Sequence, residues 1–387
     1  HRLAAAVGAI LTGCAGVASA AQWRFDNGTQ VIWNTSLSVG ASWRAQNPSN
    51  ELYSRADGQL LGLRGGVGGS NTDSATLNYE LGDRFSTPMK LVTDVEVRKG
   101  KFGALVRAKA WYDYALEHET VRMGHQNNDY NGGRGGLNSR PPLLPYNPCP
   151  GASQIIGGQP LCARGTWPRA TLNDDGFEDL QKFSGVYLLD AYAYGSFGIG
   201  DTDLQLRLGR QVVNWGESVF IQGVNQINPI DVPAARRAGA ELKEILLPVW
   251  MAYANWGFDF GSIEAFYQLQ WNNTSVDACG TYFSVTSTLI GADPGSCNSI
   301  TVFGPAIGSA LPGTVSPLVP QLGSQPFQQG TAGTYVPATQ GREPSDSGQF
   351  GLAFRFPVEK LDTEIGLYAM NIHSRLPVSA SITGTNW

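Results

Sequence analysis

Apolar and polar side chains alternate with a period of two residues along much of the chain, most clearly from Val31 to Arg44. The face of this segment that begins at Val31 is mostly apolar, whereas the face that begins at Ile32 is mostly small and polar. This period is typical of a β-strand whose two faces meet different surroundings. The fourteen residues would span about 45 Å at about 3.3 Å each, which is long for a soluble sheet.

The alternation recurs, and we predict nine strands near residues 31–44, 89–98, 102–115, 185–197, 203–214, 249–256, 263–271, 348–356 and 363–373. The connections alternate between short turns and long loops, the long ones being 45–88, 116–183, 215–248 and 272–347. Short turns at one end of the strands and long loops at the other are typical of outer-membrane β-barrels. A soluble β-sandwich, the alternative, has no reason to separate its loops in this way.

The expected fold is therefore all-β, a transmembrane antiparallel β-barrel of the outer-membrane type with long extracellular loops. One short helix is expected at residues 233–247, because Pro233 suits a first helical turn and Pro248 would end the helix. Nine strands is an odd number, and no strand with an aromatic end closes the set. We therefore expect the sequence to be the N-terminal part of a longer barrel.

The composition narrows the class further. Charged residues make up 15% of the chain, against about 25% in ordinary soluble domains. The net charge of −5 argues against a nucleic-acid partner, which would require a basic patch. Beyond the N-terminus no run of eighteen apolar residues occurs, which excludes membrane-spanning helices.

The first twenty residues resemble a secretory signal peptide. Arg2 is followed by an apolar stretch from Leu3 to Val17 and then by the small residues Ala18, Ser19 and Ala20. We predict cleavage after Ala20, which leaves residues 21–387 as the mature domain in the bacterial outer membrane. The alternative is processing as a lipoprotein at Cys14.

Export makes disulfides the expected state of the four remaining cysteines, since they would lie in an oxidising compartment. They form two local pairs, and we predict the disulfides Cys149–Cys162 and Cys279–Cys297 in extracellular loops. A zinc site built from all four thiolates is the alternative, but no pair has the CxxC spacing.

Polar side chains on the inner parity of the strands would line the barrel lumen. Acidic and basic charges are mixed there, which predicts no strong ion selectivity. Arg210 falls on the lipid-facing parity, and Gly209 is the candidate for a bulge that turns it inward. The candidates for the lumen or a gate are Arg107, Lys109, Arg207, Arg210, Gln211, Asn214, Glu217, Glu264 and Gln268.

Residues 209–248 carry a family resemblance. The segments Gly209–Ser218, Ile227–Asp231 and Gly239–Pro248 resemble those of exported proteobacterial proteins known only by a domain-of-unknown-function label. The resemblance implies an adhesin-like or outer-membrane protein encoded near inner-membrane transporters of the resistance-nodulation-division type. It also implies a connection with hydrophobic or lipid-like compounds.

We find no catalytic constellation and no cofactor motif, and we expect no enzyme. Ser218 lacks the second glycine of a nucleophile elbow, and the acidic stretch Asn173–Asp179 fails the calcium-loop pattern. The favoured function is a conduit or docking barrel for a hydrophobic or lipid-like compound, in contact with outer-membrane lipid and an inner-membrane exporter. Segment 215–248 would be a gate in the lumen or, alternatively, a cap on the rim. A general porin, or a surface adhesin that uses loops 116–183 and 272–347, remains the alternative.

Overall fold

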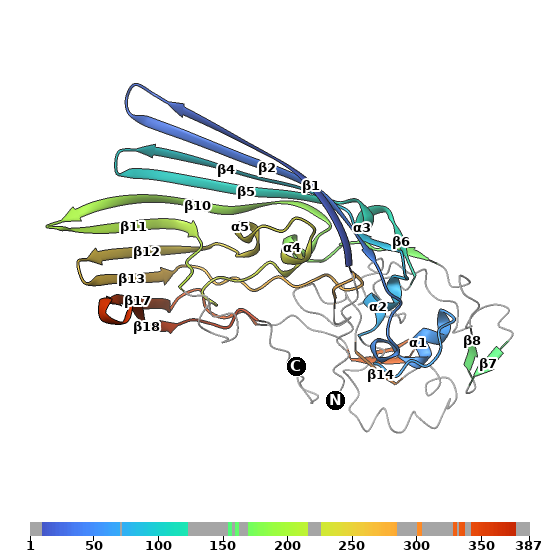
Figure 1. Cartoon of the computed structure of the whole chain (residues 1–387). Helices are drawn as coiled ribbons and strands as arrows, with labels where there is room; N and C mark the ends of the chain where they lie inside the picture. The colour runs from blue at the N-terminus through green and yellow to red at the C-terminus, as the bar shows by residue number, and fades with distance from the viewer. Residues whose placement is uncertain are drawn as a thin grey trace.

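Ten strands follow one another in one antiparallel sheet, each paired with the next along the chain (Figure 1). The computed structural model describes residues 10–69, 72–122, 154–156, 159–161, 169–215, 226–284, 300–303, 328–330, 333–336 and 342–376. The strands are β1 (Ile10–Arg24), β2 (Thr29–Arg44), β4 (Pro88–Lys99), β5 (Phe102–Asp113), β10 (Ser184–Ile199), β11 (Thr202–Gln211), β12 (Val249–Phe258), β13 (Gly261–Gln268), β17 (Gln349–Val358) and β18 (Thr363–Asn371). An eleventh, β3 (Arg84–Ser86), pairs with β2 beside this path.

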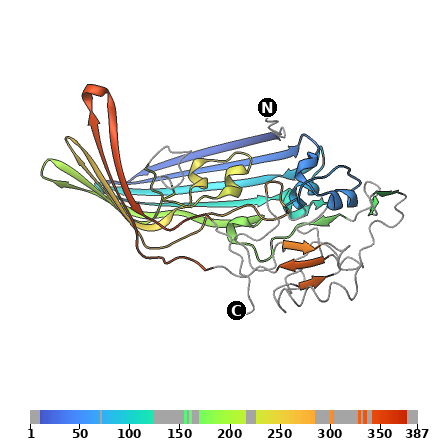
Figure 2. The same cartoon turned by 90° about the horizontal axis from the view of Figure 1, so that it is seen from below.

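The sheet is not closed, because β1 and β18 form its two edges and do not pair with each other. Short turns join β1 to β2, β4 to β5, β10 to β11, β12 to β13 and β17 to β18, and all of them lie at one end of the sheet (Figure 1). The longer connections leave from the opposite end. Figure 2 shows that the sheet is curved, with the hairpin of β17 and β18 bending away from the first strands.

The nine predicted ranges correspond to β2, β4, β5, β10, β11, β12, β13, β17 and β18. Alternation did not indicate β1, because its residues are nearly all small or apolar and resemble a signal peptide. Its pairing with β2 runs without a break from Ile10–Arg44 to Arg24–Gln30. Cleavage after Ala20 stays a prediction, and a chain cleaved there would retain only the last four residues of this strand.

Short elements fill the long connections. The helices are α1 (Arg55–Leu60), α2 (Ser74–Asn78), α3 (Tyr114–His118), α4 (Val232–Arg236) and α5 (Leu242–Ile245), with 3-10 turns at η1 (Asn50–Leu52), η2 (Asp179–Gln181) and η3 (Glu359–Leu361). Small strands pair separately: β6 (Thr120–Val121) with β9 (Ala170–Thr171), β7 (Gln154–Ile156) with β8 (Gln159–Leu161), and β14 (Ile300–Phe303) with β16 (Gly333–Val336), which also pairs with β15 (Gln328–Gly330). Among the residues in the structure, no helix is both long and apolar enough to cross a membrane.

The expectation of one helix over 233–247 was wrong. The segment forms two helices, α4 and α5, because the chain becomes extended at Arg237 and Gly239 adopts a left-handed backbone with φ of 73°. The predicted strand 102–115 also ends early, at Asp113. This residue starts α3 instead, since its carboxylate accepts hydrogen bonds from the backbone amides of Ala115 and Leu116.

A cluster of aromatic residues packs beside the sheet at the end that carries the long connections. Phe85 stacks on Tyr282 with a centroid distance of 3.9 Å, and Tyr79 contacts both rings edge-on. Phe177 and Phe183, from the connection before β10, also belong to its buried part. This cluster joins three long connections and covers that end of the sheet.

Candidate functional site

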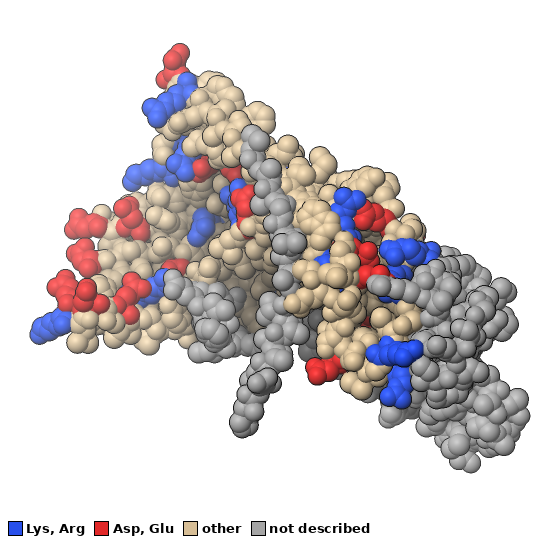
Figure 3. Space-filling view, turned by 45° about the vertical axis from the view of Figure 1, so that its right-hand side comes forward, with Lys and Arg blue, Asp and Glu red and all other residues tan. Residues whose placement is uncertain are grey.

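The two faces of the main sheet differ in chemistry. Residues that lie directly opposite one another in neighbouring strands share a face, and the face that contains Asn34, Asp94 and Arg107 is polar. We call it the inner face. The other face, called the outer face, contains Leu37, Leu91 and most of the exposed large apolar side chains. Figure 3 shows that charged side chains gather mainly near the hairpin turns and at the opposite end of the molecule.

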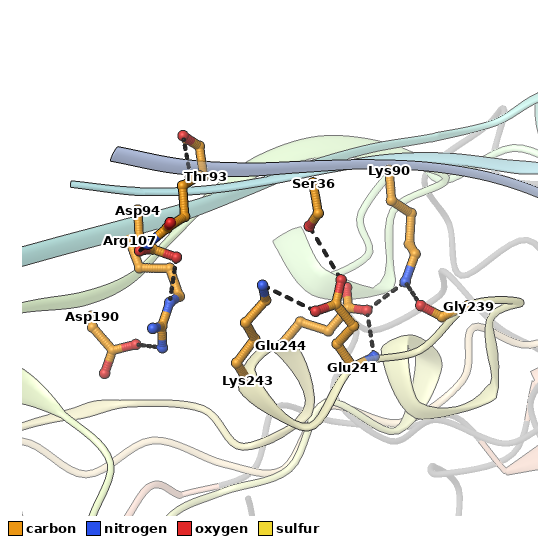
Figure 4. A network of polar contacts seen from close by, with 11 residues as sticks. Ser36, Lys90, Thr93, Asp94, Arg107, Asp190, Gly239, Glu241, Lys243 and Glu244 are labelled. Atoms are coloured by element: carbon orange, nitrogen blue, oxygen red, sulfur yellow. Dashed lines mark hydrogen bonds and ion pairs between the residues drawn. The ribbon is translucent and has the colours of Figure 1, made fainter. Parts of the chain in front are cut away.

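Residues 226–248, called here the inner loop, lie against the inner face. Two buried ion pairs attach the loop, one between Lys90 and Glu244 and the other between Lys109 and Asp231. All four side chains are at most 4% exposed. Lys90 Nζ also donates to Gly239 O at 2.8 Å, so both ends of the helical part are held (Figure 4).

The local sequence explains the form of this loop. Asp231 caps α4 by accepting a hydrogen bond from Ala234 N at 2.9 Å, and Pro233 occupies the first turn. Glu241 and Glu244 form a capping box at the start of α5. The carboxylates that cap the helices are therefore also the ones that pair with the lysines of β4 and β5.

The first half of the loop is joined to the later strands. Asn228 accepts a hydrogen bond from Val213 N, just after β11, at 3.0 Å and donates one to the backbone carbonyl of Gln211, the last residue of β11, at 3.4 Å. Ile227 is completely buried beside Trp215 and Met251 in an apolar cluster on the inner face. These contacts place the loop across the sheet, from β4 and β5 to β11 and β12.

A second polar cluster surrounds Arg107. Its guanidinium donates to Asp190 at 2.8 Å and lies 3.6 Å from Asp94, which accepts a hydrogen bond from Asn34. Asp190 reaches this position because the pairing of β10 with β5 shifts between Leu188 and Ala191. This bulge interrupts the alternation between inner and outer side chains within β10.

A third cluster is centred on Glu264. Its carboxylate accepts hydrogen bonds from Trp215 Nε1 at 2.9 Å and from the Tyr253 hydroxyl at 2.7 Å, and Arg355 lies 3.7 Å away. Arg207 lies over the Tyr253 ring at 4.2 Å from its centroid. The inner face at this position therefore alternates charged groups with aromatic rings.

Two predicted site residues, Gln268 and Gln211, are completely buried, and Gln268 holds the start of the inner loop. Gln268 donates to Ile227 O at 2.8 Å, and Gln211 donates to Met251 O at 3.1 Å. Arg375, which follows β18, also contacts Gln268, and burial lowers the pKa of this arginine to about 10. These residues stabilise the fold around the loop and do not line an open surface.

The remaining predicted site residues have different outcomes. Arg210 lies on the inner side, where it donates to the Tyr187 hydroxyl at 2.6 Å. The prediction of a bulge at Gly209 was wrong, because the pairing register with both neighbouring strands is continuous at this residue. Gly209 instead adopts φ of 135°. Asn214 is exposed, and Glu217 lies outside the described residues.

Sequence reasoning missed the partners of the lysines. Lys90 is not among the predicted site residues, and Glu244 lies within the helix predicted at residues 233–247. Asp231 immediately precedes Val232-Pro233, a signal of a helix start that was available in the sequence. Local spacing does not show, however, that a carboxylate which caps a helix also faces a lysine of a distant strand.

The predicted disulfides cannot be followed through the structure. Cys279 is buried beside Tyr282 in the aromatic cluster. Cys149, Cys162 and Cys297 lie outside the described residues, so both pairings stay predictions. The acidic stretch 173–179 forms a local turn, in which Asp174 accepts a hydrogen bond from Phe183 N at 3.0 Å.

Comparison with protein families gives one match. The family model described as protein of unknown function (DUF1302) matches residues 1–386. Neither the curated proteins nor the solved structures contain a significant match to the chain. The match covers the whole sheet and the inner loop.

Proposed function

The chain belongs to the DUF1302 family of proteins of unknown function, and we propose that it forms the wall of an outer-membrane β-barrel. This barrel serves as a conduit or docking component for a hydrophobic or lipid-like compound, which an inner-membrane exporter supplies. In this proposal the sheet closes into a barrel between the edge at β18 and the edge that β2 forms once the first twenty residues are cleaved. The observation that carries the proposal is the inner loop, held by buried ion pairs against the polar face of a sheet whose other face is apolar.

The outer face supports contact with lipid. Nine consecutive strands of the sheet each present a large apolar side chain that is more than a third exposed. A soluble protein rarely exposes a continuous apolar surface of this extent. Representative side chains, one from each strand from β2 to β18, are Leu37, Leu91, Val106, Val186, Leu208, Trp250, Tyr267, Leu352 and Leu367.

The inner loop supports a gate more strongly than a cap on the rim. Removing one partner of a buried ion pair costs about 3–5 kcal/mol, because the other charge is left without compensation. The Lys90–Glu244 and Lys109–Asp231 pairs therefore keep the loop on the inner face unless both are broken. A loop in this position narrows the passage along the inner face.

The test separates the two ion pairs from the rest of the loop. In the full-length protein, Lys90→Met combined with Lys109→Met is expected to release the loop, raise conductance in planar bilayers and alter export of lipophilic cargo by cells. The matched control is Lys243→Gln. Lys243 pairs with Glu241 at 3.0 Å in the same loop, but both side chains are about a third or more exposed, and such pairs contribute at most about 1 kcal/mol.

The outcomes distinguish the candidate functions. The proposal predicts low conductance for the wild-type protein and the Lys243→Gln variant, and higher conductance for the double variant. High conductance in the wild type would indicate a general porin. Unchanged conductance and export in a correctly folded double variant would reject the gate. Surface attachment that depends on loops 116–183 and 272–347 would favour the adhesin.

A further inference from the structure

A polar cavity of about 210 Å³ lies beside the inner loop, between the turn at Glu178, the segment after β13 and the inner side of β10 and β11. It is smaller than the roughly 300–1,000 Å³ of a pocket that encloses a whole small molecule. A cavity of this size accommodates a head group, while the rest of an amphiphile would remain outside. Leu247, the last residue of the inner loop before Pro248, forms part of its wall.

Arg210 is the basic side chain in the lining of this cavity, and little of its hydrogen-bonding capacity is used. Its guanidinium donates one hydrogen bond, to the Tyr187 hydroxyl at 2.6 Å, and lies 4.9 Å from the centre of that ring. Among the described residues no carboxylate lies within ion-pair distance of Arg210; Asp190 interacts with its charge from farther away, and the Arg210 Nε is buried without a hydrogen-bond partner there. A guanidinium presents five N–H donors in a planar fork that matches a carboxylate.

Other groups around the cavity complement this arginine. The Ser275 side chain is 2% exposed, and its hydroxyl has no hydrogen-bond partner in the described part of the chain. One of the two acids that line the cavity, Glu178, accepts hydrogen bonds from Asn273 at 3.0 and 3.1 Å. Burial raises the pKa of Glu178.

We propose that this cavity binds the carboxylate head of an amphiphilic monoanion, through the guanidinium of Arg210 and with the apolar part directed past Leu247 and the Tyr187 ring. One guanidinium matches one negative charge. A phosphate monoester carries nearly two charges, and the carboxylates of Glu178 and Asp179 beside the cavity would repel it more strongly. This inference rests on the proposed function, since it assigns the head-group chemistry of the compound.

The test measures direct binding to the purified full-length protein in lipid nanodiscs by isothermal titration calorimetry. Octanoate is the probe, 1-octanol has a similar apolar part without the charge, and octyl phosphate carries the other anion. We expect octanoate to bind at least about tenfold more tightly than either. Equal binding of octanol, or tighter binding of octyl phosphate, would overturn the assignment.

Variants assign the binding to Arg210. Arg210→Gln is expected to weaken octanoate binding about tenfold, and Arg210→Lys by a smaller factor, because lysine retains the charge but not the planar fork. The control is Lys182→Gln, since this lysine is close in sequence to the cavity residues but is 41% exposed and paired with Asp179. It should leave octanoate binding within about twofold of the wild type.

The variants also separate this inference from the function it deepens. Wild-type affinity in a folded Arg210→Gln or Arg210→Lys variant would exclude the cavity as the site. If octanoate binding depends on Arg210 but export and conductance do not respond to the loop variants, the result supports the carboxylate site and rejects the transport function. If transport responds to the loop variants but octanoate does not bind, the result supports the transport function and rejects the carboxylate site.

Discussion

At the scale of single residues, buried charge is the main feature of the inner face. Lys90 and Lys109 are each paired with one carboxylate of the inner loop, and Arg107 is placed between two carboxylates of the sheet. Such pairs do not stabilise a fold strongly by themselves, but each requires its partner to stay in place. They therefore determine where the loop lies more than how stable the protein is.

Gly209 provides a test of the geometry at Arg210. Its φ of 135° is unfavourable for any side chain, and a Cβ would lie 2.3 Å from the carbonyl oxygen of Ala191. Gly209→Ala is expected to lower the free energy of unfolding by about 1–3 kcal/mol or more, measured by urea unfolding in lipid vesicles. Gly257→Ala, where a Cβ would contact nothing within 4 Å, is the control. Equal stability of the two variants would contradict the described backbone.

Because of Asp73, we expect the stability of the connection between β2 and β3 to depend on pH. The side chain is completely buried, and burial together with the nearby carboxylate of Asp57 raises its pKa to about 9. The folded protein thus retains a proton that the unfolded chain releases near pH 4. The stabilisation is complete below about pH 4 and is lost as the pH rises towards 9.

Asp73→Asn should remove most of this dependence, because the amide cannot ionise. Hydrogen exchange of residues 54–78 at several pH values between 4 and 9 measures the effect. The exposed carboxyl of Asp26, in the turn between β1 and β2, supplies the control variant Asp26→Asn. Protection that falls equally with pH in wild type and Asp73→Asn would show that another group is responsible.

At the scale of elements, the hairpins and the inner loop differ in whether local or distant residues determine their structure. Each hairpin is specified locally, by alternating side chains and a short turn. The inner loop instead depends on contacts with β4, β5 and β13 that are distant in sequence. The hairpins can therefore form early, whereas the loop requires the assembled sheet.

The first strand, β1, gives a prediction about processing. The same residues pair with β2 in the structure and resemble a signal peptide in the sequence. We predict that the exported protein begins at Ala21, because the small residues Ala18 and Ala20 suit a signal peptidase. Mass spectrometry of the purified protein's N-terminal peptide measures this. A lipidated peptide that begins at Cys14, or an intact Ile10–Arg24 segment, would refute the prediction.

At the scale of the whole molecule, the chemical difference between the two faces is the feature that relates structure to function. Leu206 and Gln205 are neighbours in β11 but lie on opposite faces of the sheet. A bimane label on Leu206→Cys should be quenched by brominated lipid, and one on Gln205→Cys should be quenched by aqueous iodide. The same quenching pattern at both positions would exclude a sheet with one face in lipid.

The sequence by itself determined the strands, because a period of two is a local property that each segment carries independently of the others. It likewise indicated the antiparallel order and the separation of short turns from long connections, which follow from chain length between strands. The alternation of polar and apolar residues also predicted that four polar side chains share one face of the sheet. The structure places them together on the inner face: Arg107, Lys109, Glu264 and Gln268.

Only the tertiary structure decided which of these residues meet. Lys109 and Asp231 are 122 positions apart, and their pairing requires the inner loop to fold back across the sheet. The division of the predicted helix at Gly239, the bulge before Ala191 and the inward position of Arg210 also depend on packing between distant strands. Local patterns specify which face a side chain occupies, but the partners on that face are set by the curvature of the sheet and by the loop that covers it.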